Sequence, residues 1–104
     1  MKEEPIVVCL CGSTKFKQAF IDANFRETMA GKIVLSVGFF GHADSHIYTP
    51  TEQEKSALDE LHLRKIDLAD EILVLNVGGY LGDSTKRELA YATITNKSVR
   101  FLEP

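Results

Sequence analysis

The strongest structural signal in this chain lies near its amino terminus, in Ile6-Val7-Val8-Cys9-Leu10-Cys11-Gly12-Ser13-Thr14. The run from Ile6 to Leu10 is unbroken and apolar, which is typical of a strand buried on both faces of a parallel sheet. Gly12 closes the run, and two hydroxyl residues follow where an amphipathic helix is expected to begin. The stretch therefore predicts a buried strand that turns directly into a helix.

The same alternation continues along the chain. Helices are expected over 14–31, 51–69 and 84–96, further strands over 33–37, 71–75 and 98–102, and loops over 38–50 and 76–83. Thr51 and Glu54 have the spacing of a capping box, and Gly31 suits the end of the first helix. This order predicts a single α/β domain over 1–104, with about four parallel strands and three helices divided between the two faces.

Composition limits the classes of partner. The chain has 104 residues, 26% of them charged, and a net charge of −3, without the clustered Lys and Arg that duplex nucleic acid requires. No apolar run approaches the roughly 18 residues of a membrane span, and Met1 to Pro5 is too acidic and polar for a signal peptide. Two cysteines in a C-x-C strand are difficult to bridge. We therefore expect a reduced, cytoplasmic protein with no membrane or duplex partner.

Ligands of such sheets bind outside the carboxyl ends of the strands, where the strand order reverses. The residues from Cys11 to Thr14 lie at this edge. Gly12 lets a ligand approach the backbone, and the N–H groups and hydroxyls of Ser13 and Thr14 suit a phosphate. The alternative is that the two hydroxyl residues only cap the helix.

The first turn of the third expected helix offers a carboxylate, Glu88. One interpretation makes it the partner of Thr85 in a capping box in the first turn. The other makes it a nucleophile kept ionised by the helix N-terminus, with Asp83 or Ser84 nearby to bind a hydroxyl or a phosphate.

Several other residues have two interpretations. His62 and Lys65 fall inside the apolar arc that Leu58, Leu61, Ile66 and Ala69 form on the second helix, so His62 is either a core histidine or a titratable ring beside a pocket. Phe39 and Phe40 either stack on a base or cover the sheet end. Cys9 and Cys11 are expected to pack as small hydrophobic residues. The loop histidines His42 and His46 lack further ligands at a suitable spacing, so no metal site is expected.

Three segments resemble the nucleoside 2-deoxyribosyltransferase-like superfamily, and within it the N-glycosidases that split deoxynucleoside 5′-monophosphates. These segments are Leu10-Cys11-Gly12-Ser13, Leu68-Ala69-Asp70-Glu71-Ile72-Leu73-Val74 and Glu88-Leu89-Ala90-Tyr91-Ala92. The similarity extends in order over nearly the whole chain. It implies a single domain of that superfamily, with a flavodoxin-like, Rossmann-like αβα fold and an active site shared across a homodimer or larger oligomer.

The resemblance also assigns roles. Glu88 takes the place of the family nucleophile, with Ala90 where the family usually has Gly. Cys11-Gly12-Ser13 matches the turn that receives the 5′-phosphate, and Ser84 matches a helpful hydroxyl. Eight residues before Asp70, the family has a catalytic Asp where this chain has His62. Asp83 aligns with a further family Asp only across a one-residue gap, and Cys9 stands where a Tyr is common.

The function expected from the sequence is hydrolysis or transfer of the N-glycosidic bond of a nucleotide, without a metal or a redox cofactor. Glu88, His62 and Asp83 are the expected catalytic residues, and the expected substrate-binding residues are Cys11, Gly12, Ser13, Thr14, Phe39 and Ser84. Two alternatives remain open at this point. They are a nucleotide-binding domain without catalysis, and a subunit that serves only assembly.

Overall fold

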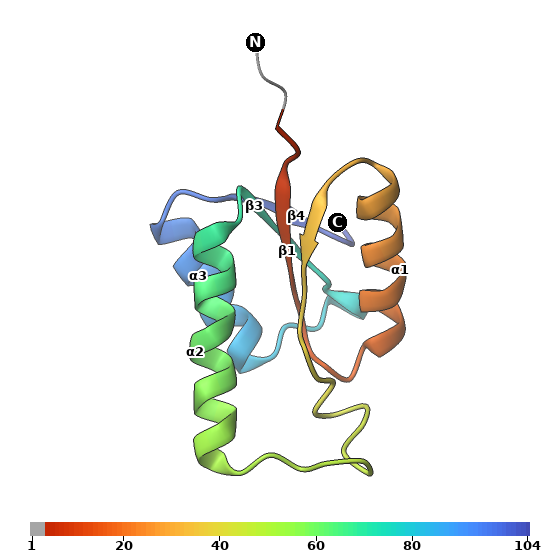
Figure 1. Ribbon diagram of the computed structural model, residues 1–104, viewed down its shortest axis with the longest axis vertical. Helices are drawn as coiled ribbons and strands as arrows, with labels where there is room; N and C mark the ends of the chain where they lie inside the picture. Colours follow the sequence, from red (N-terminus) through yellow and green to blue (C-terminus); the bar gives the residue numbers. More distant parts are fainter. Residues whose placement is uncertain (1–3) are drawn as a thin grey trace.

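The computed structural model describes residues 4–104, which form four strands and three α-helices in alternation (Figure 1). In chain order these are β1 (Val7–Cys11), α1 (Lys17–Met29), β2 (Ile33–Leu35), α2 (Glu52–Leu68), β3 (Glu71–Val74), the short 3-10 helix η1 (Val77–Gly79), α3 (Asp83–Ile94) and β4 (Ser98–Phe101). The residues Met1 to Glu3, part of the acidic start considered above, lie outside the described range. No helix within 4–104 is long and apolar enough to cross a membrane.

The strands form one parallel sheet in the order β2-β1-β3-β4. Helix α1 packs against one face of the sheet, and α2 and α3 pack side by side against the other (Figure 1). The predicted three-layer α/β fold with four parallel strands and three helices is thus confirmed. The chain runs outward from β1 to β2 and then returns to the other side of β1, so the order reverses between β1 and β3, where a flavodoxin-like sheet binds its ligand.

The hydrophobic core lies in two halves, one on each face of the sheet. Alternate residues of β1 point to opposite faces, so Val8 and Leu10 pack with Phe20 beneath α1. Cys9 and Cys11 point the other way and pack with Ile66 of α2. The strand period therefore places both thiols on the face that α2 covers.

Two helices begin at residues other than those predicted. Helix α1 starts at Lys17 rather than Thr14, because residues 12–16 form a turn in which the Phe16 N–H donates to the Ser13 carbonyl at 3.0 Å. Neither Ser13 nor Thr14 caps this helix, since its N-cap position is Phe16. The expected second strand also shortens to Ile33–Leu35.

Helix α3 begins at Asp83, one residue earlier than expected, with Gly82 at the N-cap position and no capping side chain. The predicted capping box of Thr85 and Glu88 is therefore wrong, because both residues lie inside the helix. The capping box of α2 is confirmed: the Glu54 N–H donates to Thr51 Oγ1 at 3.1 Å, and the Thr51 N–H donates to Glu54 Oε1 at 2.9 Å.

Candidate active site

A cavity of about 630 Å³ opens at the carboxyl edge of the sheet. Its walls come from the turn after β1, the loop after β2, the exposed side of α2 and the first two turns of α3. This volume falls in the range of small-molecule sites, and the position is the one expected at the reversal between β1 and β3.

Nearly all the candidate residues meet in this cavity. Those that line it are Gly12, Ser13, Thr14, Phe39, His62, Asp83, Ser84 and Glu88. Cys11 is the exception, because its side chain is fully buried on the α2 face of β1 and does not line the cavity. The fold therefore brings together residues that lie up to 76 positions apart in the sequence.

Glu88 lies in the second turn of α3 rather than in the first turn, and it is 9% exposed. Burial raises the pKa of its carboxyl group to about 7, and the neighbouring His62 opposes this rise only in part. The expectation that the helix N-terminus keeps Glu88 ionised is wrong, because the side chain starts too far along the helix and is taken out of water. The group is a carboxyl that titrates near neutrality.

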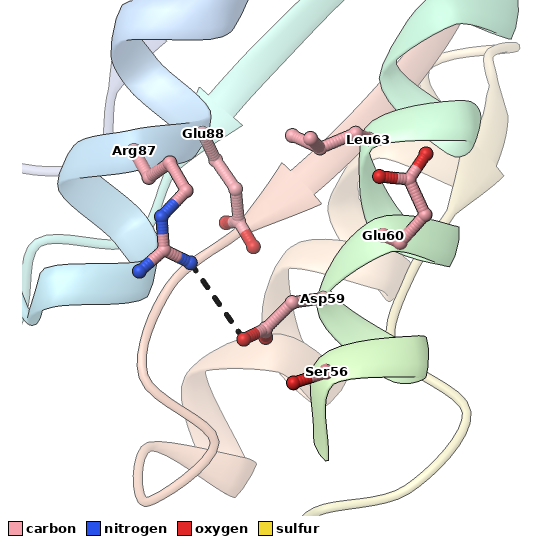
Figure 2. Close-up of a pocket in the computed structure, with 6 residues that line it drawn as sticks. All are labelled: Ser56, Asp59, Glu60, Leu63, Arg87 and Glu88. Atoms are coloured by element: carbon pink, nitrogen blue, oxygen red, sulfur yellow. Dashed lines mark ion pairs between the residues drawn. The ribbon is translucent and has the colours of Figure 1, made fainter. Parts of the chain in front are cut away.

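Figure 2 shows the Glu88 side chain reaching from α3 toward α2. A smaller hollow of about 330 Å³ lies between these helices, and Asp59 and Glu88 line both spaces. Arg87 Nη1 lies 3.6 Å from Asp59 Oδ2 and joins the two helices there. The carboxyl group of Glu88 thus borders the main cavity at its junction with this hollow.

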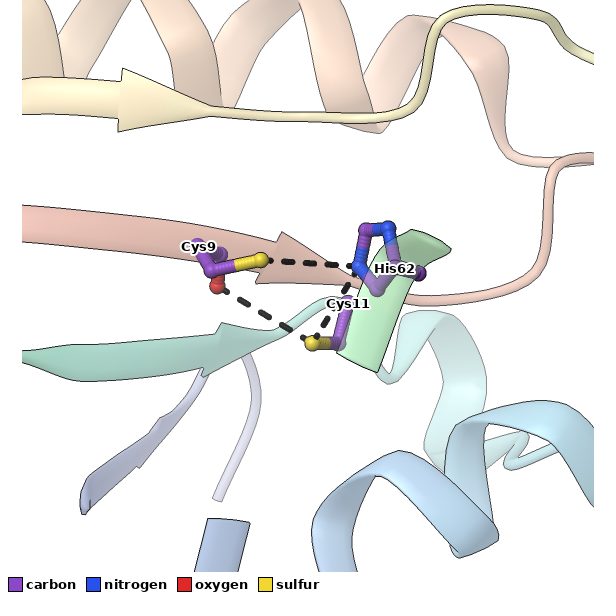
Figure 3. A group of neighbouring side chains, drawn as sticks. All are labelled: Cys9, Cys11 and His62. Carbon is purple, nitrogen blue, oxygen red and sulfur yellow. Dashed lines mark hydrogen bonds between the residues drawn. The ribbon is translucent and has the colours of Figure 1, made fainter. Parts of the chain in front are cut away.

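His62 lies on α2 and is 6% exposed, next to both cysteines (Figure 3). Its Nε2 is 3.1 Å from the Leu10 carbonyl oxygen, 3.5 Å from Cys9 Sγ and 3.7 Å from Cys11 Sγ. A carbonyl oxygen can only accept, so a proton on Nε2 is donated to Leu10. The histidine is both buried and at the wall of the cavity, which combines the two interpretations drawn from the sequence.

The charges of this group are coupled. A hydrogen bond from Cys11 lowers the pKa of the Cys9 thiol, and His62 lowers it further. Burial alone would raise it. The same contact and burial raise the pKa of Cys11. Burial disfavours the charged ring of His62, yet Cys9 and Glu88 raise its pKa above the ordinary value. Cys9 thus does more than fill space, because it favours the charged form of the imidazole beside the cavity.

The turn after β1 lines the cavity and packs closely against the end of β3. A Cβ atom at Gly12 would lie 3.1 Å from Leu75 Cβ and 3.3 Å from the Leu75 carbonyl oxygen, so glycine permits the close contact with the end of β3. Ser13 Oγ accepts a hydrogen bond from the Lys15 N–H at 3.3 Å, and Thr14 Oγ1 accepts one from the His42 N–H at 3.1 Å. Each hydroxyl acts here as an acceptor and retains its own proton for a ligand.

The two phenylalanines after β2 have different surroundings. Phe40 packs against the core, with its ring centre 5.5 Å from that of Phe20 in an edge-to-face contact. Phe39 lines the cavity and meets Tyr48 at 6.0 Å. The structure therefore gives Phe40 the covering role and leaves Phe39 facing the ligand space.

The sequence interpretation missed several residues on α2 that line the cavity, namely Lys55, Leu58, Leu61 and Lys65. The apolar arc of α2 is divided: Ile66 and Ala69 are buried, whereas Leu58 and Leu61 are 45% and 53% exposed. Lys65 Nζ donates to the Ser36 carbonyl oxygen at 2.6 Å and stays near the cavity wall. Their spacing of three to four residues on the same side as His62 is the signal that could have identified them.

Comparison with models of known protein families gave no match, and comparison with curated proteins gave none either.

Proposed function

We propose that this protein cleaves the N-glycosidic bond of a nucleoside 5′-monophosphate or a related nucleotide. One observation carries the proposal: a single cavity holds a buried carboxyl group on Glu88, the imidazole of His62 and the open turn from Gly12 to Thr14. These supply, in that order, a nucleophile, a proton donor and donors for a phosphate.

Each part of such a nucleotide has a chemically suitable partner among the residues that line the cavity. The phosphate is held at the turn after β1 by backbone N–H groups and by the hydroxyls of Ser13, Thr14 and Ser84, with Lys55 adding positive charge. The base lies against Phe39 and the exposed leucines of α2. Asp83, the first residue of α3, binds a sugar hydroxyl or orients Glu88.

In the first step, the Glu88 carboxylate attacks C1′ through an oxocarbenium-like transition state. The bond between C1′ and the base nitrogen breaks, its electron pair leaves with the base, and His62 supplies the proton that neutralises the base. The product is a glycosyl ester on Glu88. In the second step, water attacks C1′ and gives its proton to His62, which regenerates Glu88. Alternatively, a second base accepts the sugar.

A base-release assay tests the proposal. The protein is incubated with ribo- and deoxyribonucleoside 5′-monophosphates, with and without an acceptor base, and the free base is separated by chromatography. We expect release by the wild type and a loss on the order of a thousandfold or more in Glu88→Gln. The matched control is Glu52→Gln, which changes an exposed residue at the start of α2 and should keep full activity.

Other outcomes assign the chain to one of the alternatives. Saturable nucleotide binding without base release would make it a non-catalytic binding domain. Absence of binding would favour a role in assembly only. The expectations of a homodimer or larger homo-oligomer and of a cytoplasmic location belong to the same proposal, and sedimentation measures the first of them.

A further inference from the structure

Cys9, Cys11 and His62 form a compact group of metal-binding side chains. The two Sγ atoms and one ring nitrogen lie within 4.8 Å of one another, and all three residues are buried (Figure 3). No other such group of three occurs among the histidine, cysteine and acidic residues in the described part of the chain. The sequence predicts no metal site, because it does not reveal which residue of α2 lies opposite the two thiols.

Both nitrogen–sulfur distances in this group match those of a tetrahedral zinc site. Bonds of about 2.3 Å to sulfur and about 2.0 Å to nitrogen place a sulfur and a nitrogen roughly 3.6 Å apart around Zn²⁺. The distances from His62 Nε2 to Cys9 Sγ and Cys11 Sγ are 3.5 and 3.7 Å. Both elements that hold these side chains, the central strand β1 and the long helix α2, are regular there, so the site needs little rearrangement.

We propose that Cys9, Cys11 and His62 bind one Zn²⁺ ion. Thiolate and imidazole ligands favour a thiophilic ion over Mg²⁺ or Ca²⁺, and two cysteines with one histidine form a known zinc ligand set that leaves a fourth position open. Glu88 is the neighbouring buried carboxyl group and interacts electrostatically with Cys9 and His62. Glu88 is not part of the group whose ligand atoms lie within 4.8 Å of one another, so the fourth position is left to water.

Binding exchanges protons for the ion. The ion replaces the thiol protons and the Nε2 proton that points to the Leu10 carbonyl, and these protons pass to solvent. A metal-bound Nε2 has no proton to give. A zinc-bound imidazole cannot become the imidazolium that gives a proton to the base, so zinc should suppress base release. This consequence rests on the proposed function, whereas zinc binding itself does not.

The test uses the full chain after treatment with a chelator and a reductant. Zn²⁺ is titrated by calorimetry, and Co²⁺ serves as a spectroscopic substitute. We expect one ion per chain, with the thiolate-to-cobalt charge-transfer band and the intense visible absorption of a tetrahedral complex. His62→Asn and Cys11→Ala should each weaken binding by at least about a hundredfold. His42→Asn, which removes a histidine of the loop after β2, should leave it unchanged.

The proposal fails if the wild type takes up neither ion, or if the cobalt complex has no thiolate band. It also fails if the Cys11 and His62 variants, shown to be folded by circular dichroism, bind as tightly as the wild type. The spectrum of the wild type decides the matter even if a variant does not fold. These measurements use no nucleotide, so their result does not depend on the result of the base-release assay. If base is released and one equivalent of zinc leaves the rate unchanged, the assignment of both roles to His62 is wrong.

Discussion

The buried position of Glu88 lowers the free energy of unfolding at neutral pH. A carboxyl group with a pKa of 4.5 when unfolded and about 7 when folded binds more protons in the native state across that interval. Stability therefore falls as the pH rises from 4.5 to 7, and at about 1.4 kcal/mol for each pKa unit the cost is on the order of 3–4 kcal/mol. Stability at neutral pH therefore gives no reason for a carboxylate at this position.

We therefore predict that Glu88→Gln stabilises the protein while it abolishes base release. The free energy of unfolding should rise by about 1–3 kcal/mol at pH 8 and change little at pH 4.5, because the wild-type side chain is neutral there. Urea denaturation at the two pH values measures this. A variant that is less stable than the wild type at pH 8 would show that the ionised carboxylate is stabilised in place.

The pH dependence of base release provides a second prediction at this scale. Glu88 must be ionised and His62 protonated, so the rate should rise with pH through about 7 and fall again above the raised pKa of His62. His62→Asn should lower the rate by about 10² to 10⁴ and remove the descending limb. The measurement is kcat/KM from pH 5 to 9. An unchanged profile in the variant would exclude His62 from proton transfer.

Residue types and spacings predicted two walls of the cavity, the turn after β1 and the start of α3. Gly12, Ser13 and Thr14 follow the buried strand at the expected edge, and the acidic residues at the start of α3 share that edge. The group of Cys9, Cys11 and His62 was not predicted, although each residue was considered separately. A strand period of two places the thiols on one face, but only the packed structure shows which turn of α2 covers them.

At the scale of elements, the turn from β1 to α1 depends on contacts that the local sequence does not contain. Thr14 accepts a hydrogen bond from His42 in the loop after β2, and Gly12 lies against Leu75 at the end of β3. These contacts explain why a turn replaces the first predicted residues of α1. Likewise, both Gly82-Asp83 and Thr85-Glu88 carry signals for a helix start, and the structure places Thr85 and Glu88 against the core side of α3.

This turn yields a third prediction. In Gly12→Ala, the new methyl group would meet Leu75, whose backbone is held in the sheet by a hydrogen bond from its N–H to the Cys11 carbonyl at 2.8 Å. We expect a loss of about 1–3 kcal/mol in the free energy of unfolding and weaker nucleotide binding. Gly38→Ala is the control for stability, because no atom lies within 4 Å of its added Cβ. Equal stability of the two variants would mean that the end of β3 can move away.

At the scale of the whole molecule, the sheet separates the site from a charged network at its opposite edge. Glu27 of α1 is 8% exposed, and Glu71 of β3 is half-buried. Each carboxylate forms ion pairs with both Lys32 and Arg100. Lys32 Nζ is 2.8 Å from Glu71 Oε2, and Arg100 Nη2 is 3.0 Å from the same oxygen. The network joins α1, the start of β3 and the edge strand β4 at the amino ends of the strands. It joins residues that lie far apart in the sequence, from Glu27 to Arg100.

The contribution of this network to stability falls at low pH, whereas the contribution of Glu88 rises. Burial alone would raise the pKa of Glu27 and Glu71, but Arg100 and Lys32 lower both below the ordinary value. Their contribution to stability is therefore complete above the unfolded pKa of 4.5 and is lost as the pH falls through the lowered folded values. Acid should weaken this edge of the sheet, whereas it relieves the buried carboxylate at the other edge.

Arg100→Met should lower the free energy of unfolding, because it removes one cation of the network. The side chain of Arg100 is 40% exposed, so solvent screening limits the expected loss to about 1–2 kcal/mol at pH 7. The loss should shrink as the pH falls below 4.5 and the wild-type carboxylates take up protons through their lowered pKa values. Arg87→Met is the matched control, since its pair with Asp59 at 3.6 Å is more exposed and should contribute less than about 0.5 kcal/mol. Urea denaturation of both variants at pH 7 and pH 3 distinguishes the cases. If Arg100→Met costs no more than Arg87→Met at pH 7, the network does not hold the edge strand.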